Sequence, residues 1–209
     1  MTETAGTLTD RRRAATRLTI AVAALRLFAE QGLTATTVEE VAASAGVGLR
    51  TFYRYFPSKQ DAIVPLLTRG AEAWRAELAD IPTGAPLREA VAGAIATRFT
   101  PAGSGDSADL ELTRGLMRTV AGDRDLQRVW HDVNGDSERR LVPVFADLTG
   151  DHEGLAPRLL ASAATDAIRL ALEIWSAPDA PDEPGPAEIA RECFARLTEW
   201  YDDAGAVRD

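Results

Sequence analysis

The stretch Thr36–Lys59, TTVEEVAASAGVGLRTFYRYFPSK, decides the fold of the N-terminal part of the chain. Thr37 precedes Glu40 by three positions, the spacing of a capping box, in which each side chain binds a backbone amide left free at a helix start. A helix is therefore predicted to begin at Thr37. Gly46 can adopt the left-handed conformation that ends a helix, so the chain is expected to turn there.

A second helix is predicted over Leu49–Phe56. Phe52 and Phe56 stand four positions apart and Leu49 precedes Phe52 by three, so these three side chains are expected to share one face and to point into the core. The opposite face is predicted to carry guanidinium and hydroxyl groups, with Tyr53 at its margin: Arg50, Thr51, Arg54 and Tyr55. Such a face suits duplex DNA, because arginine pairs bidentately with guanine and hydroxyl groups bind phosphate oxygens.

Two linked motifs carry a resemblance to a known family. Thr36-Thr37-x-x-x-Val-Ala-x-x-Ala-Gly-Val, followed by Thr51-Phe-Tyr-x-Tyr-Phe-Pro-Ser-Lys59, resembles the DNA-binding domain of the TetR/AcrR family of bacterial one-component repressors, over about residues 11–65. The remaining chain is similar to that family only in length and helical character. The resemblance implies that seven residues lie at DNA-contact positions: Thr37, Leu49, Arg50, Thr51, Tyr53, Tyr55 and Lys59.

The second helix departs from the family pattern at its start. Many members carry serine where Gly48 stands and glycine where Arg50 stands, so Gly48 removes a capping hydroxyl group while Arg50 adds a candidate base contact. With Arg50-Thr51-Phe52 in this place, the segment is similar to the actinobacterial branch of the family that includes mycofactocin-type regulators.

Basic residues flank the two helices. Lys59, the only lysine of the chain, follows Ser58, which is predicted to cap the next helix together with Asp61. A helix N-terminus attracts phosphate, so a phosphate contact is favoured over an ordinary exposed lysine. The run Arg11–Arg13 either follows the DNA backbone or forms a disordered basic tail, and the sequence leaves both open.

The net charge of −9 is distributed unevenly. Residues 1–60 contain eight basic and five acidic residues, a net charge of +3, whereas the remainder has a net charge of −12. The uneven distribution favours a basic DNA-binding module attached to an acidic body.

The chain as a whole is predicted to be all-α, with about nine helices. A helix over Arg11–Gln31 is expected to stop at Gly32, and another from Lys59 towards Asp80 is expected to be kinked by Pro65. Pro- and Gly-rich breaks separate five further helices, near residues 86–99, 107–120, 124–149, 155–176 and 187–203, with Asn134-Gly135 as a possible interruption. The division is into a helix-turn-helix head of three helices, residues 1–57 with the basic arm, and a ligand-binding and dimerisation domain, residues 58–209.

The last two helices are candidates for self-association. Small and apolar residues such as Ala163, Ala167 and Ile174 permit close helix approach, and Leu197 and Trp200 extend a second stripe. The family resemblance implies a four-helix homodimer interface built from these helices, and a monomer's own core is the alternative. A two-fold dimer places two recognition helices about 34 Å apart and thereby binds a palindromic operator.

A ligand site is predicted in the second domain, lined by seven residues: Phe99, Arg114, Met117, Arg118, Trp130, Leu172 and Trp175. The aromatic and aliphatic members are also typical of an ordinary core, and the two arginines of a solvated face. If Arg114 and Arg118 hold an anionic group, an acyl-CoA-like effector fits best, since the similar actinobacterial branch is associated with such ligands.

No catalytic or metal site is predicted. His131 and His152 form no ligand-spaced cluster with the lone Cys193, and no phosphate loop or nucleophile elbow occurs. No cofactor is expected. The start of the chain lacks a signal peptide, and no apolar run approaches the roughly 20 residues that span a bilayer, so a cytoplasmic protein without a membrane partner is expected.

Three functions remain after these steps: a ligand-responsive DNA-binding repressor, which the motifs favour, a helical enzyme or carrier with an apolar cavity, and an architectural DNA-binding protein without an effector. Salt-dependent binding to one palindrome separates the first from the second, and release by a small molecule separates it from the third.

Overall fold

The computed structural model describes residues 8–82, 84–99 and 106–201, and within these ranges every regular element is a helix. The prediction of an all-α fold with about nine helices is confirmed. Asn134 and Gly135 do not interrupt the long seventh helix. The elements follow one another as α1 (Leu8–Ala35), α2 (Val38–Ser44), α3 (Leu49–Tyr55), the 3-10 turn η1 (Gln60–Ile63), α4 (Val64–Ala79), α5 (Leu87–Phe99), α6 (Asp106–Ala121), α7 (Arg124–Thr149), α8 (Ala156–Trp175) and α9 (Pro186–Leu197).

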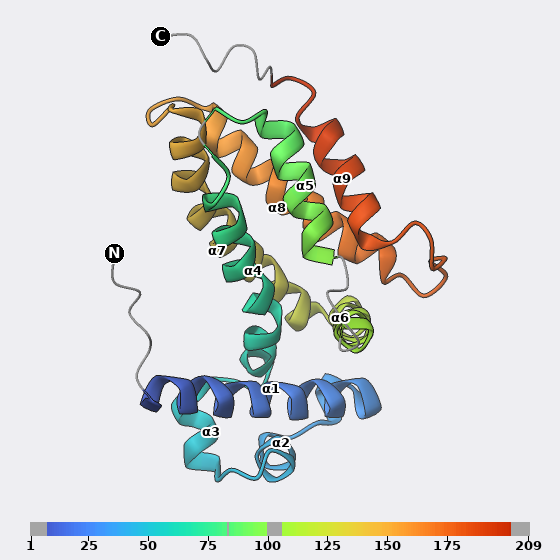
Figure 1. Cartoon of the computed structure of the whole chain (residues 1–209). Coiled ribbons are helices and arrows are strands. Elements are labelled where there is room, and N and C mark those ends of the chain that lie inside the picture. Colours follow the sequence, from blue (N-terminus) through green and yellow to red (C-terminus); the bar gives the residue numbers. More distant parts are fainter. Residues whose placement is uncertain (1–7, 83, 100–105, 202–209) are drawn as a thin grey trace.

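The head is formed by α1, α2 and α3, with α1 lying across the base of the body and α2 and α3 on its far side (Figure 1). Regular helix geometry in α1 is broken at Gly32, whose φ of 82° lies in the left-handed region, so the predicted stop is confirmed. Fully or almost fully buried apolar side chains from the three helices meet beneath α1: Ile20, Phe28, Val41, Phe52 and Phe56.

Helix α1 corrects the expectation that no apolar stretch approaches the length needed to span a bilayer. An 18-residue window within Leu8–Ala35 has a mean hydropathy of 1.2, which is long and apolar enough to cross a membrane by length and composition alone. In the fold, 39% of this window is buried, and Ile20, Ala24 and Phe28 lie in the core of the head. Packing inside the protein therefore accounts for the buried part of this apolar stretch.

The connection from head to body differs from the predicted kinked helix. Ser58 and Asp61 do form the predicted cap: the Ser58 amide donates to the Asp61 carboxylate at 3.1 Å, and the Asp61 amide donates to the Ser58 hydroxyl group at 3.3 Å. The chain then makes the 3-10 turn η1, and Pro65 falls in the first turn of α4. Proline is tolerated at that position because the first amides of a helix have no intrahelical acceptor, so Pro65 does not kink α4 from within.

The body is a bundle in which α8 packs against both α7 and α9, while α5 packs against α9 and α4 against α7. Four alanines of α8 are fully buried, which lets its neighbours approach closely within one chain: Ala161, Ala164, Ala167 and Ala171. The apolar core of the head continues without a break into the body, through buried side chains of η1, α4, α6, α7 and α8. The boundary between residues 57 and 58 stays a prediction.

Candidate nucleic-acid interface

The turn between α2 and α3 has the geometry that the sequence predicts. The Thr37 hydroxyl accepts a hydrogen bond from the Glu40 amide at 3.2 Å, and the Glu40 carboxylate accepts one from the Thr37 amide at 2.8 Å. The bond from the Thr37 amide, and after it a bond of 2.9 Å that the Thr37 hydroxyl donates to the same carboxylate, hold the pKa of Glu40 below its ordinary value. Gly46 has a φ of 67°, and Gly48 begins α3 without a side-chain cap. The start of α2 and the path into α3 are thereby fixed.

Fewer side chains of α3 point into the core than predicted: two rather than three. Phe52 and Phe56 are buried, with ring centroids 5.7 Å apart, as expected. Leu49 is wrong as a core residue, since 41% of it is exposed. It stands at the first turn of α3, at the end of that helix farther from α1 (Figure 1). Exposure leaves Leu49 at the surface with the other proposed contact residues.

The outward face of α3 presents cations and hydroxyl groups to solvent. Arg50, Arg54 and Tyr53 are exposed, Tyr53 by 56%, so it lies on this face rather than at its margin. Thr51 and Tyr55 are half-buried. Within the ranges that the structure describes, no salt bridge joins Arg50 or Arg54 to an acidic side chain. The described residues therefore leave the two guanidinium charges on this face without an acidic partner.

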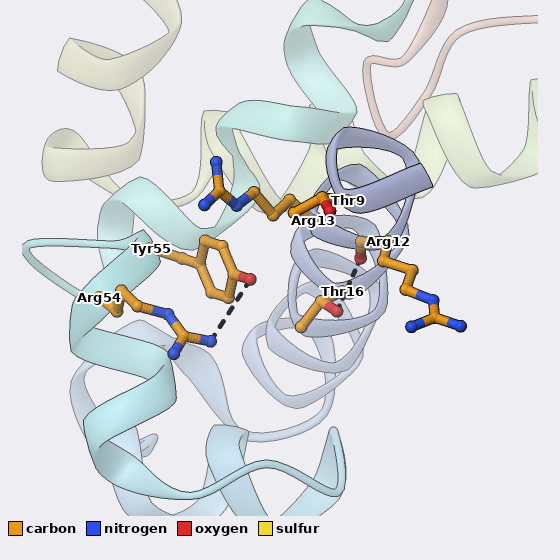
Figure 2. Close-up of a pocket in the computed structure, with 6 residues that line it drawn as sticks. All are labelled: Thr9, Arg12, Arg13, Thr16, Arg54 and Tyr55. Carbon is orange, nitrogen blue, oxygen red and sulfur yellow. Dashed lines mark hydrogen bonds between the residues drawn. The ribbon is translucent and has the colours of Figure 1, made fainter. Parts of the chain in front are cut away.

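A hollow of about 560 Å³ lies between the first turns of α1 and the end of α3. Figure 2 shows Arg13 reaching towards Tyr55 from α1 and Arg54 reaching towards it from α3, while Arg12 points away. The Arg54 guanidinium lies 4.9 Å from the centroid of the Tyr55 ring. The hollow is lined by cationic and hydroxyl side chains alone: Thr9, Arg12, Arg13, Thr16, Arg54 and Tyr55.

Sequence reasoning left the basic run near the N-terminus open, and it missed the two threonines. Arg11, Arg12 and Arg13 belong to α1, not to a tail. Thr9 stands three positions before Arg12, and Thr16 stands four positions after it. Residues at these spacings share one face of a helix, so this spacing is the signal that could have placed the two threonines beside Arg12. The site thus extends from α3 to α1.

Lys59 makes contacts that the sequence did not reveal. Its ammonium group donates hydrogen bonds of 2.7 Å to the carbonyl oxygens of Leu33 and Thr36, at the end of α1. A cation is favourable there because the last carbonyl groups of a helix lack partners. Lys59 therefore ties η1 to the end of α1, whatever else it binds.

The seven predicted ligand-site residues lie in one region of the body. Met117, Trp130, Leu172 and Trp175 belong to the apolar cluster that joins head and body, and Phe99 packs against it. The Arg114 guanidinium lies 4.3 Å from the centroid of the Trp175 ring, and Arg118 donates to the carbonyl oxygen of Ser176 at 3.1 Å. The indole of Trp130 donates to Glu173 at 3.0 Å.

The remaining chemistry-bearing side chains are dispersed. Among the residues that the structure covers, no group of three or more His, Cys, Asp and Glu side chains is placed to hold a metal ion. Cys193 is half-buried, and burial raises the pKa of its thiol. Nothing in this arrangement resembles an activated nucleophile.

Residues 20–62, which include α2, α3 and most of α1, match the family model described as bacterial regulatory proteins, tetR family. The chain is also 31% identical over 129 residues to the HTH-type transcriptional regulator TcmR of Streptomyces glaucescens. That match covers 61% of this chain and 57% of TcmR, so the chain spans little more than half the length of that relative.

Solved structures with similar folds cover nearly the whole chain. FadR of Bacillus subtilis in complex with stearoyl-CoA has a TM-score of 0.57 at 20% identity, covering 88% of this chain and 99% of its own. FadR of Thermus thermophilus in complex with lauroyl-CoA has a TM-score of 0.54 at 21% identity, covering 92% and 96%. NalD of Pseudomonas aeruginosa, the secondary repressor of a multidrug efflux pump, has a TM-score of 0.55 at 20% identity, covering 90% and 95%. At these identities the likeness establishes the fold.

Proposed function

We propose that this chain, whose residues 20–62 match the model of the tetR family of bacterial regulatory proteins, is a ligand-responsive repressor that binds a palindromic operator as a homodimer. The observation that carries the proposal is the exposed face of α3, where no described acidic side chain forms a salt bridge with Arg50 or Arg54, next to the arginine-lined hollow. The proposed protein is cytoplasmic and not an enzyme, and residues 1–57 and 58–209 are its DNA-binding and effector domains.

The side chains proposed for DNA contact divide into two kinds. Arg50, at the second position of α3, is the candidate base contact, because a guanidinium group pairs bidentately with guanine in the major groove. The others are proposed to position the head on the sugar-phosphate backbone, a role in which hydroxyl groups, ammonium groups and helix starts all serve. These positioning residues are Thr37, Leu49, Thr51, Tyr53, Arg54, Tyr55 and Lys59.

Apolar side chains on the outer surface of the bundle support the proposed homodimer. Leu155, just before α8, is 64% exposed, and Ile174, near the end of α8, is 51% exposed. Leu159, Leu197 and Trp200 are also exposed. Such side chains favour burial against a second copy of the chain, because exposed apolar surface gains free energy when water is removed from it. The buried alanines of α8 do not take part, because they already pack inside one chain.

The proposed effector is a small hydrophobic or acyl-CoA-like molecule bound near α6 and α8. Two FadR proteins of similar fold are bound to stearoyl-CoA and lauroyl-CoA. In this chain Met117, Trp130, Leu172 and Trp175 supply apolar surface beside Arg114. Because α6 also packs against α1, a ligand that displaces α6 changes the position of the head. Any ligand that favours the displaced state must weaken operator binding by the same factor.

Selection of duplexes from a random pool with the full chain tests the proposal. The expected product is a palindrome whose half-sites are about 10 base pairs apart, bound by two chains. Binding is then measured by fluorescence anisotropy, with lauroyl-CoA and stearoyl-CoA as release probes. Arg26→Ala serves as the control variant, because Arg26 is an exposed arginine of α1 paired with Glu30 and outside the hollow.

The outcomes separate the parts of the proposal. Recovery of a palindrome bound two-to-one supports the dimeric regulator, and recovery of no preferred sequence contradicts it. Operator binding that neither probe weakens contradicts the acyl-CoA-like effector and leaves the DNA-binding role in place.

A further inference from the structure

Arg114, in the middle of α6, is a buried cation. Only 11% of its side-chain surface is exposed, and its guanidinium group stacks on the ring of Trp175, the last residue of α8. Removing a charge from water is unfavourable unless hydrogen bonds and opposite charge compensate. The partners of Arg114 therefore determine what this position is built to hold.

The described residues supply only part of the hydrogen bonds that the buried guanidinium group of Arg114 can make. One terminal nitrogen of Arg114 donates to the Asp182 carboxylate at 3.0 Å. The Nε atom of Arg114 is buried and has no hydrogen-bond partner in the described part of the chain. A guanidinium group has five donors in a planar fork, which suits a bidentate anion, so the one hydrogen bond that Arg114 makes among the described residues leaves most of that capacity unused.

The partner that is present is easily displaced. Asp182 lies in the segment between α8 and α9, and 92% of its side-chain surface is exposed. An ion pair with one partner in solvent contributes little free energy, because water and salt compensate the exposed charge. Asp182 can therefore leave Arg114 at small cost when a competing anion arrives.

The surroundings of Arg114 define the competing anion. Met117, one turn along α6, and Leu172 and Trp175 of α8 are buried apolar side chains in one cluster. Arg118, also on α6, is exposed and donates from its Nε atom to the carbonyl oxygen of Ser176, so Arg114 is the buried cation of this cluster. One cation above apolar side chains is the arrangement that recognises a single anionic group on a hydrophobic body.

We propose that Arg114 is the binding site for the anionic group of a hydrophobic ligand, and that Asp182 occupies this site as an internal competitor until the ligand displaces it. The inference rests on the proposed effector site and specifies its chemistry. Displacement frees the segment between α8 and α9 from α6, while the bond from Arg118 to Ser176 remains.

Calorimetric titration of the full chain tests the exchange with three probes that share one tail. Laurate carries a carboxylate, lauroyl-CoA carries phosphates, and dodecanol carries no charge. Asp182→Asn removes the competitor and is expected to tighten binding of the preferred anion about two- to fivefold, the size expected for release of an exposed ion pair. Asp179→Asn, an exposed residue of the same segment, is the matched control and is expected to leave affinity unchanged.

Arg114→Gln is expected to weaken the preferred anion at least tenfold while leaving dodecanol unchanged, because only the charged probe uses the guanidinium group. Arg114→Lys keeps the charge without the fork and is expected to bind at an intermediate level, which separates anion binding from a folding defect. The preference between laurate and lauroyl-CoA identifies the anion as carboxylate or phosphate.

Equal affinity of Asp182→Asn and wild type overturns the exchange. Equal losses for dodecanol and the anions in Arg114→Gln overturn the anion site. Failure of the wild-type chain to bind either anion, with operator binding intact, also overturns the inference without affecting the DNA-binding role. Failure to bind DNA is a separate result that contradicts the proposed function itself.

Discussion

The head and the body each contain an arginine stacked on an aromatic ring, and the two pairs differ in exposure. Arg54 lies 4.9 Å from the centroid of Tyr55 at the surface of the head, whereas Arg114 lies 4.3 Å from that of Trp175 and is buried in the body. The first has other arginines beside it and no salt bridge among the residues described. The second has one carboxylate partner.

The difference shows how burial changes what the same interaction can do. An exposed guanidinium group that shares a hollow with other cations suits a polyanion, whose binding grows with the number of phosphates contacted. A buried guanidinium group beside apolar side chains suits one anionic group, since its charge must be compensated locally. The head is therefore suited to DNA and the body to a small ligand.

Lys59 is half-buried, between the exposed Arg54 and the buried Arg114. Its substitution is the change for which we expect the largest effect, a loss of folding stability. Lys59→Met removes two hydrogen bonds from a charged donor to the carbonyl oxygens of Leu33 and Thr36. We expect the free energy of unfolding to fall by about 3 kcal/mol, measured by urea denaturation without DNA. Arg26→Met, which removes an exposed cation of α1, is expected to change it little. Equal stability of Lys59→Met and wild type would show that these bonds are not formed in solution.

Arg50→Ala tests whether the exposed cations of the head determine sequence preference. Loss of a bidentate pair with guanine is expected to reduce discrimination at one base pair by about 2 kcal/mol, roughly thirtyfold. Tyr53→Phe is expected to weaken all sequences alike. Anisotropy measurements on the selected operator and its single-base variants give both numbers. Unchanged affinity in both variants would show that α3 is not the recognition helix.

Arg13→Gln and Arg54→Gln test the arginine-lined hollow. Each variant is expected to reduce the slope of log K against log salt concentration by about one, because one phosphate contact is lost. Between 50 and 200 mM salt, this makes the loss of affinity about fourfold smaller than in wild type. Arg26→Gln should retain the wild-type slope. A slope that neither hollow variant alters would exclude phosphate binding there.

Glu40→Gln tests the support beneath the DNA-binding face and has the smallest effect. Hydrogen bonds from Thr37 lower the pKa of Glu40 below its ordinary value of 4.5 in the folded state. A lowered pKa means that the carboxylate stabilises the fold at neutral pH, and that this stabilisation is lost as the pH falls below 4.5. The melting temperature of Glu40→Gln should therefore lie below that of wild type at pH 7, with a difference that shrinks under acid.

Glu39→Gln is the matched control for the acid experiment, because Glu39 is exposed one position earlier and makes no capping bond with Thr37. Its melting temperature is expected to follow wild type across the pH range. A Glu40→Gln difference that stays constant from neutral to acid pH would contradict the capping role of the carboxylate.

Local signals in the sequence predicted most of the head. Thr37 with Glu40, and Gly46, fixed the limits of α2 because each acts within one helical turn. Arg124–Thr149 was predicted to the residue as one segment, although Asn134 and Gly135 had left its continuity open. Helix length and type follow from interactions between near neighbours, and the sequence shows these directly.

Contacts between distant residues were beyond prediction. Lys59 meets carbonyl groups 23 and 26 residues earlier, and Arg114 meets a carboxylate 68 residues later. Leu49 was expected in the core because helical spacing defines a face but not where along the helix its packing ends. Pro65 was expected to kink a helix because the sequence does not reveal the 3-10 turn before α4.

Amide hydrogen exchange of the full chain, with and without its selected operator, tests the DNA-binding role of the head most directly. The account predicts slowed exchange in α2, in α3 and in the first turns of α1, and little change on the outer surface of the body. Slowed exchange confined to the body, or none in α3 at saturating operator, would contradict it.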